Sequence, residues 1–174
     1  MIYDLRYYGD RVLREKCKPV EKVTDEIKQL IADMIETMDS KNAIGLAASQ
    51  IGKLLRIFVI RPYITSDDGE YSLGDPEVYI NPVLTSPTDI LETTSEGCLS
   101  FPGFYPDIER PLGITVEALN EKGEKFKEVI EGFRARQIMH ENDHINGVLF
   151  IDRLTPKDRK KYQSEIQKIK KKYS

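Results

Sequence analysis

Residues 137 to 144 read Gln137-Ile138-Met139-His140-Glu141-Asn142-Asp143-His144 and contain both histidines of this 174-residue chain. Residues four apart on an α-helix lie on the same face, so His140 and His144 can reach one cation together. Glu141 projects beside them, and the order H-E-x-x-H is typical of metal-dependent hydrolases. Such a cation lowers the pKa of a bound water, whose proton the glutamate can then accept. The stretch therefore predicts a helix that carries a hydrolytic metal site.

The H-E-x-x-H pattern also occurs by chance, on helices that simply expose two histidines to solvent. The side chains on either side of the motif favour a buried helix instead, and the apolar ones are Ile138, Met139, Ile145, Val148, Leu149 and Phe150. A buried helix carries histidine, glutamate and aspartate together only where these side chains have polar partners. We therefore interpret the motif as a metal site.

The motif supplies two ligands for a metal ion, and a third must come from elsewhere in the chain. Two known extensions of the motif fit poorly, because Phe150 stands where a third histidine would be and Glu165 lies in a lysine-rich tail. The two cysteines remain as candidates. Cys17 lies in a charged segment and is interpreted most simply as a packed thiol. Cys98 follows an expected strand, and Gly97 beside it allows a close approach of the backbone.

Three segments of the chain together resemble the peptide deformylase family. Glu96-Gly97-Cys98-Leu99-Ser100 is similar to the EGCLS motif of that family, and His140-Glu141-Asn142-Asp143-His144 is similar to its HExDH helix. The segment Ala43-Ile44-Gly45-Leu46-Ala47-Ala48-Ser49-Gln50 resembles its GxGLAAxQ motif. The three segments come in the order and spacing of the family, and the resemblance runs from about Leu5 to Leu154.

The resemblance implies a metal-dependent hydrolase that removes the formyl group from N-formylmethionine at the N-terminus of nascent polypeptides. It implies that Cys98, His140 and His144 hold one divalent metal ion. The resemblance implies that Fe²⁺ is the physiological ion and that preparations of the protein can hold Zn²⁺, Ni²⁺ or Co²⁺ instead. A site of one cysteine and two histidines also suits Zn²⁺ by softness and geometry.

The resemblance also implies how a formylated peptide is bound and activated. Glu141 would carry the proton of the attacking water to the leaving amine. Gln50 and the backbone N–H of Leu99 would polarise the formyl oxygen. The residues that would bind the substrate, including its methionine side chain, are Ile44, Gly45, Gly97, Phe133 and Gln137.

The resemblance raises two further expectations about the surroundings of this site. Glu96 and Arg110 would form a buried ion pair that braces the cysteine loop, the alternative being two unrelated surface charges. The glycine-rich segment has Ala43 where the family usually has glycine, and Ser49 where it often has proline. The methyl group of Ala43 either narrows the approach of a substrate backbone or fills a gap in the core.

Two other functions share some of these features. A zinc endopeptidase would use the same helix but normally lacks a cysteine ligand, so Cys98 argues against it. A metal-binding paralogue that has lost turnover would require neither Glu141 nor Gln50. The presence of both residues therefore favours an active enzyme.

Length and composition predict one catalytic domain over residues 1–174, because domains typically run to about 100–200 residues. The net charge of −3 gives no reason to expect DNA as a partner. The N-terminal residues lack an apolar signal segment, and no run of residues is apolar enough for a membrane span. Two cysteines give no disulfide framework, so we expect a cytoplasmic protein.

We expect an α+β fold in which antiparallel strands wrap around the H-E-x-x-H helix, with one core helix before it and one helix after it. Thr24 caps the first helix, whose apolar face consists of Ile27, Leu30, Ile31, Met34, Ile35 and Met38. Strands are expected over residues 54–60, 78–84, 90–98, 113–119 and 125–130. The polar residues between 61 and 76 predict a surface hairpin or loop.

The lysine-rich tail over residues 155–174 is expected to form a solvated helix. Four of its lysines lie close together, and they are Lys168, Lys170, Lys171 and Lys172. In some bacterial deformylases the C-terminal helix contacts the ribosome, and this basic run keeps a ribosome contact near the exit tunnel open as a hypothesis.

Overall fold

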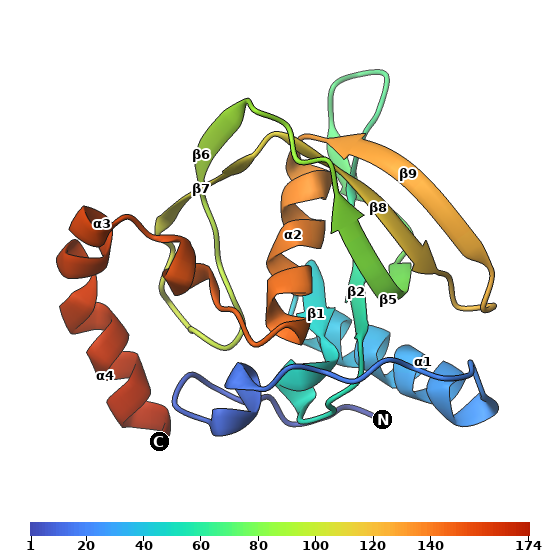
Figure 1. Cartoon of the computed structure of the whole chain (residues 1–174), viewed down its shortest axis with the longest axis horizontal. Coiled ribbons are helices and arrows are strands. Elements are labelled where there is room, and N and C mark those ends of the chain that lie inside the picture. Colours follow the sequence, from blue (N-terminus) through green and yellow to red (C-terminus); the bar gives the residue numbers. More distant parts are fainter.

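Helix α2 (Phe133–Ile145) lies between a five-stranded antiparallel sheet and a two-stranded hairpin in the computed structural model, which describes residues 1–174 (Figure 1). The sheet has the order β1-β2-β5-β8-β9, and these strands span Gly45–Ala47, Ile57–Ile60, Glu77–Thr85, Gly113–Leu119 and Lys125–Glu131. All neighbouring strands in it are antiparallel. The expected α+β fold around the motif helix is confirmed.

Helix α2 separates its apolar and its polar side chains by helical spacing. Ala135, Ile138 and Ile145 are fully buried, and they pack in one core cluster with side chains of the sheet such as Phe58 and Val116. The polar residues Gln137, His140, Glu141 and His144 recur at spacings of three and four and are also buried. Burial of the apolar face therefore orients the polar face toward the interior of the site.

Helix α1 (Asp25–Ser40) begins where the sequence predicts, with the Thr24 hydroxyl accepting a hydrogen bond from the Ile27 N–H. Two acidic residues, Asp25 and Glu26, occupy its first turn, where the helix dipole favours negative charge. Its apolar face packs against β1 and β2 in a second core cluster, with Leu30, Ile31, Met34 and Met38 buried. The predicted core helix is confirmed.

Two hairpins stand apart from the main sheet. Strands β3 (Tyr63–Thr65) and β4 (Tyr71–Leu73) form the surface hairpin expected between residues 61 and 76. Strands β6 (Leu91–Ser95) and β7 (Asp107–Pro111) form the other. The sequence predicted a strand that continues to Cys98, but β6 ends at Ser95 and the cysteine lies in the loop beyond it.

The tail is helical as expected, but it is divided and partly packed. Helix α3 (Pro156–Lys161) is followed by α4 (Gln163–Tyr173), and Tyr162 lies between them. Ile166 is buried, and the ring of Tyr173 stacks on Tyr7 at 4.2 Å between ring centroids. The expectation of a solvated helix therefore holds only for the outer face, because apolar residues on the inner face pack against the N-terminal segment.

Short 3₁₀ helices complete the chain: η1 (Arg11–Arg14), η2 (Ala48–Ile51) and η3 (Phe150–Arg153). Helix η1 lies in the N-terminal segment, for which the sequence predicts no regular structure. Helix η2 continues β1 and carries Gln50 toward α2. None of the helices has the combined length and apolar character that crossing a bilayer requires.

Candidate active site

The structure brings Cys98 together with the two histidines of α2. The sulfur of Cys98 lies 3.3 Å from Nε2 of His144, and one donor atom from each of Cys98, His140 and His144 lies within 4.8 Å of the others. A thiol sulfur and two imidazole nitrogens at this separation fit a transition-metal ion. Cys17 is buried elsewhere, where burial raises the pKa of its thiol to about 11. The geometry thus singles out one of the two cysteine candidates.

His140 is oriented by Glu96, the residue that follows β6. Nδ1 of His140 lies 2.8 Å from a carboxylate oxygen of Glu96, and both side chains are buried. Burial alone would disfavour the charged carboxylate, but hydrogen bonds from His140 and Arg110 outweigh it and hold the pKa of Glu96 well below its usual range. A carboxylate only accepts hydrogen bonds, so Nδ1 carries a proton, and in the neutral ring Nε2 is the nitrogen that can bind a metal ion.

Glu96 also anchors two buried guanidinium groups. Arg110 donates to both of its oxygens at 2.6 and 3.0 Å, which confirms the expected ion pair. Arg136 donates to Glu96 at 2.6 Å and to the backbone carbonyls of Glu92 and Ile108. Helix α2 is thereby tied to both strands of the β6–β7 hairpin.

Arg110 extends this network to the far side of the motif helix. It donates to Asp143 at 2.9 Å, and Asp143 also accepts two hydrogen bonds from Arg153. The sequence indicated that Asp143 needs a polar partner without showing which one, and it gave no role to Arg136. The available signal was their position on a helix expected to be buried, where each charge needs a partner.

Glu141 lies beside the ligand cluster and has little space around it. Its side chain is buried, one oxygen has no hydrogen-bond partner, and desolvation raises the pKa of the carboxyl to about 7. A Cβ atom added to Gly45 would lie 2.6 Å from the other oxygen. Only glycine at position 45 therefore lets β1 pass so close to this carboxyl group.

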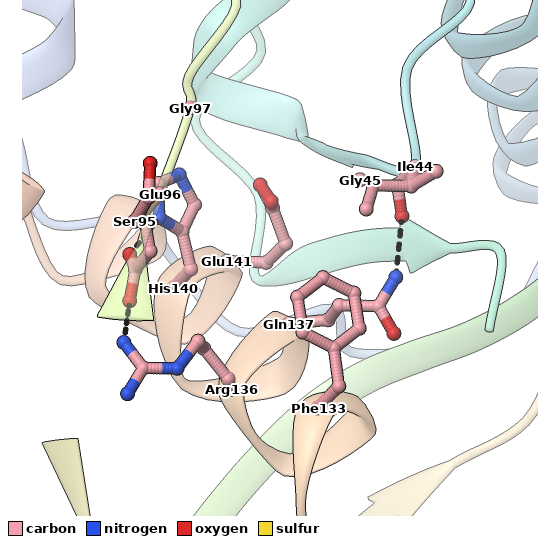
Figure 2. Close-up of a pocket in the computed structure, with 10 residues that line it drawn as sticks. All are labelled: Ile44, Gly45, Ser95, Glu96, Gly97, Phe133, Arg136, Gln137, His140 and Glu141. Carbon is pink, nitrogen blue, oxygen red and sulfur yellow. Dashed lines mark hydrogen bonds and ion pairs between the residues drawn. The ribbon is translucent and has the colours of Figure 1, made fainter. Parts of the chain in front are cut away.

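A cavity of about 90 Å³ adjoins Glu141 and His140 (Figure 2). All five residues that the resemblance assigns to substrate binding line it: Ile44, Gly45, Gly97, Phe133 and Gln137. The amide nitrogen of Gln137 donates to the carbonyl of Ile44 at 3.3 Å and to that of Arg61 at 2.8 Å. Its amide oxygen has no partner. The cavity therefore has two apolar walls, Ile44 and Phe133, and two of its lining residues, Gln137 and Glu141, each carry an acceptor oxygen without a partner.

A family model described as polypeptide deformylase matches residues 2–160. A peptide deformylase from Clostridium botulinum is 46% identical over 155 residues, which cover 88% of this chain and 97% of the relative. The chain belongs to the polypeptide deformylase family.

Solved deformylase structures have the same fold. The enzyme from Ehrlichia chaffeensis superposes with a TM-score of 0.88 at 34% identity, covering 99% of this chain and 97% of that one. The enzyme from Thermotoga maritima gives 0.80 at 42% identity, covering 90% and 99% respectively. Family membership confirms the expected deformylase activity and its dependence on a metal ion. No finding favours the endopeptidase or the inactive paralogue.

Two hydrogen-bond donors of this deformylase lie next to Cys98. The Gln50 amide is fixed at both ends, because its oxygen accepts from the Ala47 N–H at 2.9 Å and its nitrogen donates to the Ser100 hydroxyl at 3.1 Å. The same nitrogen faces the Cys98 sulfur at 3.6 Å. The N–H of Leu99 has no partner within the protein. An oxygen atom held near the sulfur would therefore meet donors from both residues.

A wider groove of about 580 Å³ continues from the deformylase cavity toward the surface. Cys98, Gln50 and Glu141 lie at its inner end, and Ala43 and Tyr63 also line it. Ala43 is half-buried and also packs against the core cluster of α1. Its methyl group therefore borders both the groove, where a substrate backbone would approach, and the core. Ser49 is fully buried, and its hydroxyl donates to the His144 carbonyl at 3.4 Å.

Proposed function

We propose that this chain removes the formyl group from N-formylmethionine at the start of nascent peptides, with Cys98, His140 and His144 holding one divalent cation. The observation that carries the proposal is the convergence of three donor atoms within 4.8 Å beside a buried carboxyl group. When bound, the cation supplies Lewis-acid chemistry to water and to the formyl oxygen. Fe²⁺ as the cellular ion rests on the family resemblance, because the same donors also accept Zn²⁺, Ni²⁺ and Co²⁺.

Glu141 moves the proton in this reaction. Its carboxyl group accepts a proton as water attacks the formyl carbon, and it returns that proton to the nitrogen as the carbon–nitrogen bond breaks. Formate and a free α-amine are the products. Burial raises the pKa of the Glu141 carboxyl group above its ordinary value, which favours its uptake of the proton from water.

Gln50 and Leu99 stabilise the negative charge that develops on the formyl oxygen. The Gln50 amide is already oriented by Ala47 and Ser100, so it need not reorganise as the charge forms. The Leu99 N–H supplies a second donor from the cysteine loop. Two donors that are already in position stabilise the oxyanion that forms when water attacks the formyl carbon.

The methionine side chain occupies the cavity in Figure 2, between Ile44 and Phe133. Gly45 and Gly97 let the peptide backbone approach from either side, because neither adds a side chain to the cavity wall. Gln137 donates a hydrogen bond to the carbonyl of Ile44 and so fixes the backbone at the start of β1. The bound peptide runs past this part of the backbone.

The proposed substrate arises on translating ribosomes, so we expect this enzyme to act close to them in the cytoplasm. The tail supports a ribosome contact by its charge, because the lysines of α4 lie on its exposed face: Lys168, Lys170, Lys171 and Lys172. Removing residues 163–174 and measuring sedimentation with ribosomes tests this contact separately from catalysis on short peptides.

Metal content and turnover of single variants test the site. Cys98→Ala is expected to lose the metal and all activity, whereas Cys17→Ala, the matched control, keeps both. Glu141→Ala is expected to keep the metal and lower kcat on formyl-Met-Ala by at least about 100-fold. The assay is run anaerobically with Fe²⁺, with elemental analysis of each variant. Full metal occupancy in Cys98→Ala, or normal turnover in metal-replete Glu141→Ala, would refute the assignment.

A further inference from the structure

The β3–β4 hairpin exposes large apolar side chains that no part of the chain covers. Tyr63 and Leu73 are directly opposite each other in the hairpin register, and Tyr71 is two residues before Leu73. Side chains two residues apart on a strand share a face, so these three lie on one side of the hairpin. The exposed fraction is 49% for Tyr63 and 75% for Tyr71. None of these three side chains belongs to a core cluster, so packing of the core does not explain why they are large and apolar. Exposed apolar faces of this kind often bind a ligand or a partner.

The aromatic rings of this face continue a wall of the active-site cavity. Phe133, at the start of α2, lines the cavity and is 44% exposed. The ring centroid of Tyr63 lies 5.6 Å from that of Phe133, and the centroid of Tyr71 lies 6.4 Å from that of Tyr63. We call Phe133, Tyr63 and Tyr71 the aromatic ladder. In Figure 1 the hairpin projects beyond the sheet at the end where α2 begins.

The spacing of the ladder matches the repeat of an extended peptide. Side chains on one face of a strand recur every second residue, at about 6.6–6.8 Å. The two centroid separations in the ladder, 5.6 and 6.4 Å, lie close to this repeat. Tyr63 also lines the wide groove that leads away from Cys98, whereas it does not line the inner cavity. A peptide that leaves the cavity along the groove therefore meets Tyr63 first and Tyr71 next.

We propose that the aromatic ladder binds the third and fifth side chains of the formylated peptide and favours aromatic or large apolar residues there. The inference rests on the proposed function, because it takes the first side chain, methionine, to lie against Phe133. The second and fourth side chains point to the opposite side by strand alternation and leave the ladder free.

The substrate is the occupant that the geometry favours. The ladder begins at the cavity and is continuous with it, whereas an independent partner would have no reason to start at Phe133. Contact between an aromatic substrate side chain and an exposed tyrosine changes affinity by about 2- to 10-fold. The effect is therefore expected in KM, because this contact is the same before and during the chemical step.

Kinetics on matched peptides test the ladder. The wild type is expected to have a lower KM for formyl-Met-Ala-Phe than for formyl-Met-Ala-Ser, by about 2- to 10-fold. Tyr63→Ala removes this difference mainly through KM. Tyr71→Ala removes the corresponding difference between formyl-Met-Ala-Ser-Ala-Phe and formyl-Met-Ala-Ser-Ala-Ser. Leu91→Ala, which truncates an exposed apolar side chain on the other hairpin, is the control and preserves both differences.

Three outcomes would overturn the inference. The first is a wild type that treats phenylalanine and serine alike at the third position. The second is a Tyr63→Ala variant that keeps the wild-type preference. The third is a wild-type dimer in sedimentation analysis that Tyr71→Ala dissociates, which would assign the face to a second copy of the chain. The short substrate formyl-Met-Ala is expected to end before it reaches Tyr63, so its hydrolysis does not depend on the ladder. Failure of the wild type to hydrolyse formyl-Met-Ala would refute the proposed function. Normal hydrolysis of formyl-Met-Ala together with any of the three outcomes would refute only the role of the ladder.

Discussion

Hairpin β6–β7 is joined to α2 by buried charges, whereas hairpin β3–β4 meets the same helix through exposed aromatic rings. Arg136 of α2 donates to carbonyls of both β6 and β7 and to Glu96 just beyond them. The other hairpin is held mainly at its base, where Arg61 donates to the Gly74 carbonyl and pairs with Asp39 of α1. Its strands have no buried residue.

The two hairpins differ because they meet two different requirements of one enzyme. Metal ligands must stay within a few tenths of an ångström of their positions, and a dense network of charge-assisted hydrogen bonds achieves this. A surface that receives many nascent sequences must tolerate different side chains, and exposed aromatic rings do so. The first hairpin therefore serves the chemistry, and the second serves peptide selection.

Removing Glu96 is expected to have the largest effect, because it breaks the network at its centre. In Glu96→Ala, Arg110 keeps only Asp143 as a charged partner, Arg136 keeps only backbone carbonyls, and His140 loses the acceptor for Nδ1. Breaking a buried ion pair from one side costs about 3–5 kcal/mol. Urea unfolding of the metal-free protein measures the loss in the free energy of unfolding.

Two comparisons sharpen this prediction. Glu109→Ala changes an exposed glutamate of β7 and is expected to alter stability by less than about 0.5 kcal/mol. The folded state lowers the pKa of Glu96, so its ionised form stabilises the protein above pH about 4.5, its ordinary value, and this contribution is lost as pH falls below it. The wild type should therefore lose more stability in acid than Glu96→Ala does. Equal acid sensitivity would contradict this account of the network.

A methyl group at position 45 is expected to reduce catalysis while leaving the fold intact. Gly45→Ala brings Cβ to 2.6 Å from a Glu141 oxygen, and the buried carboxyl group has to move. A displacement of about 1 Å in a catalytic group can cost roughly 100-fold in rate. Measurements of kcat, circular dichroism and metal content separate this loss from misfolding.

The matched control for Gly45→Ala is Gly69→Ala at the tip of the β3–β4 hairpin. Nothing lies within 4 Å of a Cβ there, and the positive φ of 84° makes the substitution strained only locally. We expect a cost of about 1–2 kcal/mol confined to the hairpin and a normal kcat on formyl-Met-Ala. A comparable loss of kcat in both variants would show that the two regions are not independent.

The smallest effect is expected at Asp68, which holds the turn of the β3–β4 hairpin. Its carboxylate accepts hydrogen bonds from the Ser66 hydroxyl and the Glu70 N–H. Asp68→Ala is expected to speed amide hydrogen exchange in residues 63–73 while the global melting temperature stays unchanged. Faster exchange across β6 and β7 in the same variant would contradict the separation of the hairpins.

The helices were predictable because their signals are local. The apolar spacing after Thr24 and the histidine spacing in α2 are each complete within a few turns of sequence. Strand β7 was not predicted, because Asp107-Ile108-Glu109-Arg110-Pro111 contains residues that are rare in strands. Its pairing with β6 and the burial of Ile108 and Arg110 stabilise it, and both depend on distant parts of the chain.

The ligand residues were identified through motifs, but the polar network around them was not. The Glu96–Arg110 pair was expected from the family resemblance. Arg136 and Asp143 lie within or next to the motif, yet their partners are up to 44 residues away in sequence. Periodicity shows that such side chains are buried and does not show which charges they meet. This part of the site required the three-dimensional structure.

Gln137 places a limit on how this enzyme can evade an inhibitor. An inhibitor that fills the methionine cavity could be excluded by a bulkier side chain at Phe133 or at position 137. At position 137, however, substitution also removes the amide that joins the Ile44 carbonyl to the Arg61 carbonyl and so frees the end of β1. Resistance through Gln137 would therefore reduce binding of the natural substrate as well.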